Sequence, residues 1–312
     1  MSKIAAIDVG SNATRMVVGE VDEICMTTPL EPKQLLLEAL ETRWKNYRTE
    51  LKRCHAEFSN EAVHDLRVAT RRMLALMQLL NSISPRPRLQ KLARAFKEQL
   101  DEFDDLRDTQ VMLAELSEIL HELPQLKDFQ KHLQYAEEKL LRSLRKKIKN
   151  LESSEVTRRI RKTHAAIETT ENAELGAQIM QAVDDVYLIT KQRHIRVDLS
   201  RPATIHRVRI AFKALRYMIE IIQPVLKDFP VEYFKRMNDY QSLMGEIQDA
   251  EVFEQTLADF SEHASFSDLE PVRQYYERRH AEAISAYAAA QNQIDSFWRS
   301  APEQPFPWEK PA

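Results

Sequence analysis

The chain has 312 residues, a net charge of −3 at pH 7 and only four glycines, and it is rich in Leu, Ala, Glu, Lys and Arg. That composition predicts a mostly helical protein, large enough for one elongated domain or two smaller ones. No run of about 18 apolar residues occurs, so a membrane-spanning helix is excluded. Cys25 and Cys54 lack the spacing of metal ligands, and we expect no signal peptide, no metal and no cofactor in a protein of the reducing cytoplasm.

The charged residues are segregated along the chain. Residues 142–162 hold nine Lys or Arg against two Glu, whereas residues 98–122 are strongly acidic. A net charge near zero argues against a polyanionic partner, but local basic surfaces remain compatible with one. We interpret the run at 142–162 as a solvated helix surface.

The N-terminal residues 4–21 (IAAIDVGSNATRMVVGEV) predict a strand, a turn and a second strand, because β-branched residues flank a Gly-Ser-Asn turn. This stretch resembles the first hairpin of the exopolyphosphatase and guanosine-pentaphosphatase family, in which an Asp-x-Gly-Ser-Asn-x-x-x-Arg segment lines a phosphate site. The matching residues here are Asp8, Gly10, Ser11, Asn12 and Arg15. The resemblance ends after residue 21, and no later segment supplies the other strands that such a fold requires.

We therefore interpret residues 1–28 as an appended β-hairpin without catalytic activity. Two strands alone are marginally stable in water and leave unpaired edges. The simplest partner for those edges is the hairpin of a second copy, which predicts a homodimer formed through this segment.

Beyond Pro32 the sequence predicts helices with short connections, which is typical of antiparallel bundles. The predicted helices cover residues 33–58, 60–82, 88–120, 127–151, 173–193, 202–222, 232–260 and 269–298. Residues 153–172 are polar and predict a bridge between two sets of four helices. The predicted fold class is all-α, with two tandem four-helix bundles at residues 30–160 and 161–300 after the hairpin. The proline-rich residues 301–312 predict a disordered tail.

One helical segment occurs twice, as VHDLRVATRRM at residues 63–73 and as IHRVRIAFKALR at residues 205–216. At about 100° per residue, the basic residues of the second copy fall within about 80° of arc, opposite the apolar residues. They are His206, Arg209, Lys213 and Arg216. In the first copy His64, Arg67 and Arg71 follow the same line, with Arg72 on its flank. Each helix is thus expected to have one face for the core and one cationic face.

A second match supports an internal duplication. LRDTQVM at residues 106–112 precedes IQDAEVF at residues 247–253 by 141 positions, close to the 142 positions that separate His64 from His206. Arg94 and Lys235 are both basic at the shorter offset. Because a repeat that keeps both faces of a helix is hard to obtain by chance, we expect the two halves to have arisen by duplication.

Together, these two repeated motifs resemble the CHAD (conserved histidine α-helical domain) family over about residues 30–300. The resemblance implies two four-helix bundles, related by a pseudo-twofold axis, whose basic helices face one another and bind inorganic polyphosphate. Carried over by position, the implied binding residues are His64, Arg67, Arg71, Arg72, His206, Arg209, Lys213 and Arg216. We add Arg94 and Lys235 to the predicted binding residues because both are basic at the shared offset. The halves differ where Leu74 stands in place of Arg216 and where Asp104 stands in place of Gly245.

The sequence therefore predicts a polyphosphate-binding protein without catalytic activity. Arg and Lys side chains spaced one turn apart along a helix suit a polymer of phosphates. Asp108 and Asp249 are expected either to orient these cations or to form plain salt bridges with them. Polyphosphate granules and phosphate-metabolising enzymes are the partners that this function implies.

Three alternatives compete with this prediction. Histidine phosphotransfer would use His64, although a stripe of cations is foreign to such domains. An accessory or hydrolytic role in polyphosphate metabolism is the second alternative. Against hydrolysis, the Glu-x-Glu-x-Lys signature of triphosphate tunnel enzymes is absent, and no carboxylate cluster for metal stands out. Nucleic-acid binding would need aromatic residues interleaved with the basic ones, which the sequence does not show.

Overall fold

A computed structural model describes residues 3–10, 13–20, 30–148, 154–262 and 269–309. Its contacts divide the chain into two units, Met1–Glu31 and Pro32–Ala312. In the first unit, strand β1 (Lys3–Gly10) pairs with strand β2 (Ala13–Glu20) in antiparallel register, from Lys3 opposite Glu20 to Gly10 opposite Ala13. The predicted turn residues Ser11 and Asn12 lie outside the described residues.

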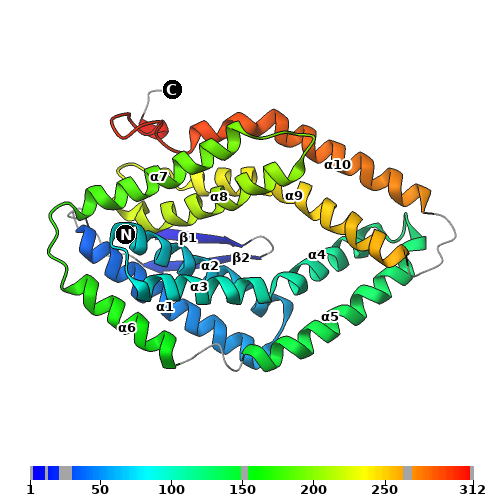
Figure 1. Cartoon of the computed structure of the whole chain (residues 1–312), viewed down its shortest axis with the longest axis horizontal. Helices are drawn as coiled ribbons and strands as arrows, with labels where there is room; N and C mark the ends of the chain where they lie inside the picture. Colours follow the sequence, from blue (N-terminus) through cyan, green and yellow to red (C-terminus); the bar gives the residue numbers. More distant parts are fainter. Residues whose placement is uncertain (1–2, 11–12, 21–29, 149–153, 263–268, 310–312) are drawn as a thin grey trace. The chain divides into compact units, whose positions relative to one another are not determined.

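The described residues of the second unit form an elongated body of helices without strands (Figure 1). The helices of its first half are α1 (Pro32–Glu57), α2 (Asn60–Ile83), α3 (Pro87–Glu102), α4 (Asp104–Ile119), α5 (Lys127–Ile148) and α6 (Ser154–Glu168). Those of its second half are α7 (Leu175–Ile195), α8 (Pro202–Ile222), α9 (Glu232–Ser261) and α10 (Glu270–Ala290). Short 3-10 turns lie at η1 (Pro124–Leu126), η2 (Gln223–Val225), η3 (Gln291–Ser296) and η4 (Pro307–Glu309).

Helix α2 lies at the centre of this body. It packs against α1 and α3 of its own half and against α7 and α8 of the other half. Its start is fixed by Ser59, whose side-chain oxygen accepts a hydrogen bond from the Ala62 backbone N–H at 3.2 Å. The side chains of Leu66, Met73 and Met77 are fully buried, as the predicted apolar stripe requires. The contact between α2 and α8 places the two repeated helices against each other.

The far end of the body, at the right of Figure 1, is built from α4, α5, α9 and α10. Phe129 of α5 packs edge-on against Phe253 of α9, with ring centroids 5.5 Å apart. Phe253 in turn stacks on Tyr276 of α10 at 4.1 Å. These rings belong to one buried cluster that both halves of the chain supply. The two halves therefore share a hydrophobic core at this end.

One predicted helix, residues 88–120, is divided in the structure into α3 and α4. The chain bends at Phe103, whose side chain is 1% exposed and whose N–H donates to the carbonyls of Leu100 and Asp101. Asp104 and Asp105 then occupy the first turn of α4, where carboxylates interact favourably with the helix dipole. The corresponding helix of the second half, α9, is continuous.

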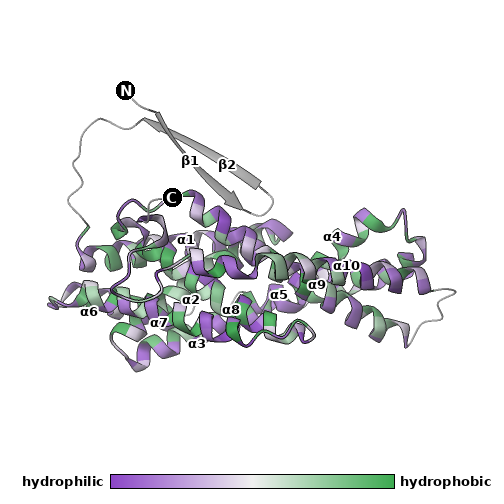
Figure 2. Ribbon diagram, turned by 90° about the horizontal axis from the view of Figure 1, so that it is seen from above, coloured by the Kyte–Doolittle hydropathy of each residue, from purple (hydrophilic) through white to green (hydrophobic). Residues whose placement is uncertain are grey.

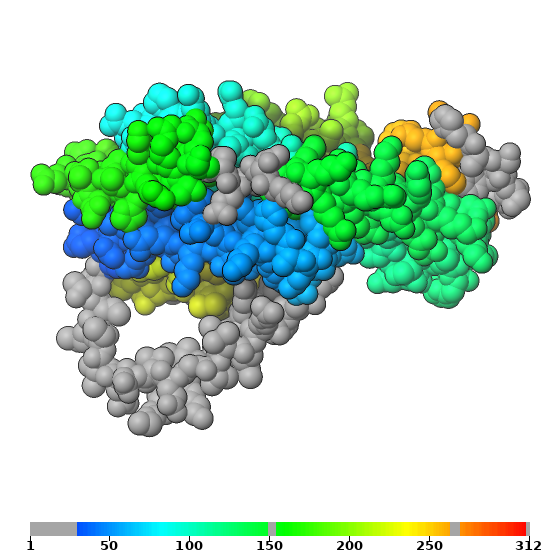
Figure 3. Space-filling model, turned by 90° about the horizontal axis from the view of Figure 1, so that it is seen from below, coloured from blue at the N-terminus to red at the C-terminus, as the bar shows by residue number. Residues whose placement is uncertain are grey.

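The polar segment that was predicted to bridge the halves is largely helical. Ile160, Thr163 and Ile167 of α6 recur at helical spacing and are buried, and α6 packs against α1 and α3. Figure 3 shows α6 beside α1 on the outer face of the molecule. The predicted boundary between residues 160 and 161 lies inside this helix, so α6 belongs to the first half as a whole.

The predicted disorder of residues 301–312 is wrong for residues 301–309, and residues 310–312 lie outside the described part. Phe306 stacks on Trp308 with ring centroids 4.5 Å apart, and Trp308 packs edge-on against Phe229 at 4.9 Å. Arg299 and the Trp298 N–H both bond Asp184 of α7. Aromatic packing and a half-buried ion pair thus order this proline-rich segment.

Every labelled helix in Figure 2 carries hydrophilic as well as hydrophobic residues. Among the described helices, none combines the length and the apolar character that a membrane span requires.

Candidate functional site

The cationic residues of the two repeated helices come together where α2 packs against α8. Arg71 and Arg67 of α2 both act electrostatically on Lys213 of α8, and Arg71 also acts on Arg209. Helix α4 adds Arg107, which lies close enough to Arg71 for the two charges to interact. We define the cation cluster as His64, Arg67, Arg71, Arg107, His206, Arg209, Lys213 and Arg216.

On the α2 side, Arg67 is a buried residue, only 3% exposed. Its Nη1 donates to the backbone carbonyl of Leu100 at 3.1 Å, and its Nη2 donates to Oδ1 of Asp104 at 2.8 Å. Both acceptors flank the bend between α3 and α4. The expectation that Arg67 lies on a purely cationic face opposite the core is therefore wrong, because the bend brings acceptors over it.

On the α8 side, Lys213 has basic neighbours. Burial lowers the pKa of Lys213 well below its usual value, and four arginines lower it further. These are Arg209, Arg71, Arg67 and Arg216. Burial also lowers the pKa of Arg209, which Asp249 partly opposes. This half of the cluster is a region of closely spaced positive charge.

Several nitrogens on α8 are buried without a hydrogen-bond partner among the described residues. They are Nε of Arg209, Nε of Arg216 and Nδ1 of His206. Buried polar atoms in proteins are nearly always satisfied, so each of these requires an explanation. A ligand that brings hydrogen-bond acceptors would provide one.

The two histidines of the repeat have similar surroundings. Burial is the main cause that lowers the pKa of His64 and of His206, and nearby cations lower both further. For His64 these cations include Arg107, whereas at the equivalent place Gln248 hydrogen-bonds the His206 side chain. Both rings are therefore mostly neutral near pH 7 in the free protein.

The acidic residues Asp108 of α4 and Asp249 of α9 face the cluster without binding any of its cations closely. Burial raises the pKa of Asp108, and the charges of Asp104 and Asp249 raise it further. Neither Asp108 nor Asp249 forms a close ion pair with a described residue, so the prediction of plain salt bridges is not met. Their carboxylates instead set the local field around Arg107 and Arg209.

At one end of the cluster a single carboxylate faces three guanidinium groups. Nε of Arg72 lies 3.2 Å from Oε2 of Glu220, and Nη1 of Arg216 lies 3.6 Å from Oε1. Burial lowers the pKa of Arg43, on α1, to about 10, and Glu220 opposes this effect. Arg72 is thus engaged by Glu220, and positive charge exceeds negative charge here as well.

Comparison with known proteins identifies the family of the chain. The model of the family described as "CHAD domain" matches residues 37–258. The chain belongs to the CHAD domain family. No curated protein sequence matches the chain.

Two solved structures share the fold of this CHAD domain. The crystal structure of the CHAD domain from the plant Ricinus communis superposes with a TM-score of 0.60 at 18% sequence identity, covering 88% of this chain and 92% of that one. PptA from Streptomyces chartreusis superposes with a TM-score of 0.58 at 17% identity, covering 88% of this chain and 100% of that one. At these identities the similarity establishes the fold alone. The resemblance of residues 4–21 to the exopolyphosphatase hairpin stays a prediction.

Two predicted site residues of the CHAD domain lie away from the cation cluster. Arg94 on α3 is exposed, and Lys235 on α9 is exposed and bonds Asp239 at 2.6 Å. No interaction in the described part of the chain connects either of them to the cluster. Arg94 and Lys235 are equivalent positions of the duplicated helices, but both lie on helix faces that point to solvent.

Sequence reasoning missed Arg107 and Arg43. Arg107 stands in the repeated motif beside Asp108, but its counterpart is Gln248, so the comparison of the two halves gave no basic pair. Arg43 lies in the first helix, which carries no copy of the basic motif. A search for positions that are basic in only one half would have found Arg107.

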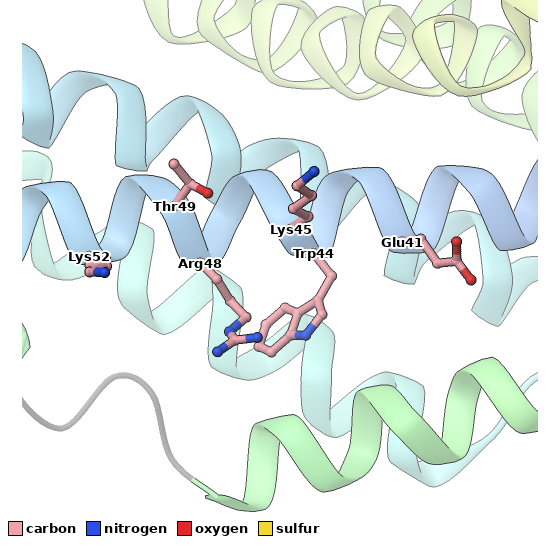
Figure 4. A pocket seen from close by; sticks show the side chains of 6 residues that line it. All are labelled: Glu41, Trp44, Lys45, Arg48, Thr49 and Lys52. Carbon is pink, nitrogen blue, oxygen red and sulfur yellow. The ribbon is translucent and has the colours of Figure 1, made fainter.

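A surface cavity of about 380 Å³ lies elsewhere, on the outer face of α1 (Figure 4). Its lining residues are Glu41, Trp44, Lys45, Arg48, Thr49 and Lys52. A neighbouring cavity of about 260 Å³ extends to α6, where Arg161 and His164 line it. None of the cluster residues lines either cavity. The candidate site is therefore defined by its charge and its unsatisfied nitrogens.

Proposed function

We propose that this CHAD domain binds inorganic polyphosphate on the cation cluster and carries out no chemistry of its own. The observation that carries the proposal is the set of buried nitrogens on α8 without partners, on Arg209, Arg216 and His206. A buried polar group that lacks a partner destabilises the folded protein by about 1–3 kcal/mol. Phosphate oxygens would satisfy these groups and neutralise the charge that lowers the pKa of Lys213.

The spacing of the cations favours a chain of phosphates as the ligand. His206, Arg209, Lys213 and Arg216 extend over ten residues of helix α8, which corresponds to about 15 Å at 1.5 Å per residue. Arginine binds phosphate oxygens through two parallel hydrogen bonds, and lysine adds a compact charge. A polyphosphate chain offers acceptors all along such a line, whereas a single phosphate would meet only part of it.

The surroundings of the cluster separate this proposal from two alternatives. A phosphotransfer histidine has to be reached by a partner protein, but His64 and His206 are half-buried among cations. Single-stranded nucleic acid needs aromatic rings on which bases can stack. The Tyr217 ring lies beneath the Arg216 guanidinium, with 4.7 Å between Cζ of Arg216 and the ring centroid. Because the Tyr217 side chain is buried, a base cannot stack on it.

In the same proposal the hairpin of residues 1–28 takes no part in chemistry and serves assembly with a second copy. The protein then acts in the cytoplasm, beside polyphosphate granules or phosphate-metabolising enzymes. The matches of Asp8 and Arg15 to a phosphate-binding segment do not suffice for hydrolysis, because an active phosphatase of that type needs further segments that this chain lacks.

Isothermal titration calorimetry with polyphosphates of defined length, compared with single- and double-stranded DNA, tests the proposal. We expect polyphosphate to bind more tightly than either DNA. We also expect the logarithm of the association constant to fall steeply and linearly with the logarithm of the salt concentration, because several cations act together. Tighter binding of DNA, or an affinity that does not change between dilute and physiological salt, would contradict it.

A further inference from the structure

One position of the duplicated helices differs in charge between the halves, and it lies directly beside the repeated arginines. Asp104 stands at the first turn of α4, and Gly245, at its equivalent position, stands in the middle of α9. Asp104 bonds Arg67 at 2.8 Å. Gly245 offers Arg209 no side chain at all.

The contact between Gly245 and Arg209 is close. A Cβ atom built on Gly245 would lie 3.3 Å from Nη2 of Arg209, 3.5 Å from Nε and 3.8 Å from Cζ. The guanidinium group therefore lies over the glycine backbone, in the place that a side chain at position 245 would occupy. Gly245 has no positive φ angle, so space and not backbone conformation explains a glycine there. In the interior of a helix glycine is otherwise unfavourable.

Arg67 and Arg209 therefore differ in the hydrogen-bond acceptors that they meet. Arg67 already has two acceptors, the Leu100 carbonyl and Asp104. Arg209 has a buried Nε without a partner, and its nearest acidic influence is Asp249, which forms no close ion pair with it. The charge of Arg209 is thus left without a close carboxylate, whereas the charge of Arg67 is paired with that of Asp104.

We infer that Gly245 is a positioning and specificity-determining residue of this site, and that Arg209, not Arg67, is the repeated arginine that holds the anion. This inference rests on the proposed function. An aspartate at position 245 would copy the arrangement of the first half and give Arg209 an internal carboxylate in place of a phosphate. Asp104, conversely, neutralises the charge of Arg67.

Calorimetry with sodium tripolyphosphate at one fixed salt concentration, on the full chain, tests the inference with three variants. Gly245→Asp adds the carboxylate. Gly245→Ala is its matched control, because it adds only the Cβ atom and removes the glycine from the helix. Asp104→Asn removes the charge beside Arg67 while it keeps an oxygen acceptor for the hydrogen bond. Circular dichroism melts show whether each variant folds.

We expect the Gly245→Asp variant to bind tripolyphosphate at least about tenfold more weakly than the Gly245→Ala variant, since it loses one charge-assisted contact. We expect Asp104→Asn to bind more tightly than the wild type, because the variant lacks the negative charge that compensates Arg67 and repels the anion. If Gly245→Asp fails to fold, the Asp104→Asn variant decides. Equal binding by the two Gly245 variants, or no gain in Asp104→Asn, would overturn the inference while the proposed function stands. A wild-type protein that does not bind tripolyphosphate or longer chains would instead overturn the proposed function.

Discussion

Arg67 and Arg209 are the same residue of the repeat, yet they meet different surroundings. Helical periodicity places both on the cationic face, and sequence alone can reach that conclusion. Whether the guanidinium finds an acceptor depends on the helix packed against it. Arg67 meets Asp104 and the carbonyl of Leu100, whereas Arg209 meets Gly245. A substitution at Arg67 should therefore lower the free energy of unfolding more than a substitution at a cation that has no ion pair.

The pair Arg67→Met and Arg71→Gln tests this distinction. Arg67→Met removes the buried hydrogen bonds to the Leu100 carbonyl and to Asp104 and should lower the free energy of unfolding by about 2 kcal/mol. Arg71 is half-buried and forms no ion pair with a described residue, so Arg71→Gln should change stability by only about 0.5 kcal/mol. Urea denaturation measures both values, and calorimetry should show that Arg71→Gln weakens polyphosphate binding. Equal midpoints for Arg67→Met and the wild type would show that the buried bonds are not stabilising.

The histidines His64 and His206 make the stability of the free protein depend on pH. Their pKa values in the folded protein lie below the usual 6.5, mainly because of burial. Below about pH 6.5 the unfolded chain therefore binds more protons than the folded chain does. The stabilisation that the neutral histidines provide above this pH is lost as the pH falls through their folded pKa values. We expect the melting temperature to fall between about pH 7.5 and about pH 5.5, and saturating tripolyphosphate to raise it more at the lower pH, because bound phosphate favours the charged rings.

The variant His64→Gln/His206→Gln is the control for this pH dependence. It should show a flatter profile over the same range, since the carboxyl groups common to both proteins cancel in the comparison. Differential scanning calorimetry at each pH, with and without tripolyphosphate, gives the values. Profiles of equal slope in the variant and the wild type would assign the pH dependence to other groups.

At the scale of the elements, the sequence predicts well those helices whose ends carry local signals. Ser59 begins α2, and Pro202 begins α8, whose observed bounds Pro202–Ile222 equal the predicted ones. The bend at Phe103 has no such signal, because neither glycine nor proline stands there. It depends on the burial of one phenylalanine and on a bond from a distant arginine. Sequence periodicity does not contain that information.

The C-terminal segment is a second case in which tertiary contacts override local composition. Its prolines predict disorder, but Asp184 of α7 accepts hydrogen bonds from the Trp298 Nε1 at 2.7 Å and from the Arg299 Nη2 at 2.6 Å. Trp298 is 1% exposed. One carboxylate on α7 therefore fixes the start of the segment that carries Phe306 and Trp308.

Substitution of Asp184 should loosen this segment. Asp184→Ala removes the acceptor of two buried donors and should lower the free energy of unfolding by about 3 kcal/mol. The neighbouring Asp185→Ala is the matched control, because Asp185 is exposed and only accepts a bond from Gln181; we expect a change of about 0.5 kcal/mol or less. Chemical denaturation and limited proteolysis after residue 300 check both values. If the two variants are equally stable, the contacts of Asp184 do not hold the segment.

For the whole molecule, the duplication is visible in the sequence but the interlocking of the halves is not. The repeat identifies α2 and α8 as equivalent helices, and with them most of the cation cluster. It does not indicate that Phe129 of the first half and Phe253 of the second pack in one core. Such contacts join residues far apart in sequence, and apolar periodicity shows which face is buried without showing against what. The two tandem bundles of the prediction are therefore joined by a shared core that the sequence did not indicate.

The N-terminal hairpin is the part of the molecule whose role a deletion can isolate. Residues Met1–Glu31 form a unit of their own, and all residues of the cation cluster lie in the other unit. Removal of residues 1–31 should therefore leave the melting temperature and the polyphosphate affinity per chain unchanged.

The sheet has only the strands β1 and β2 in the described residues, and a two-stranded sheet with free edges is marginally stable unless it pairs. If a second copy supplies that pairing, light scattering will show a lower mass for the shortened chain. An unchanged mass would contradict assembly through the hairpin, and a loss of phosphatase activity on deletion would contradict its catalytic silence and direct attention to Asp8.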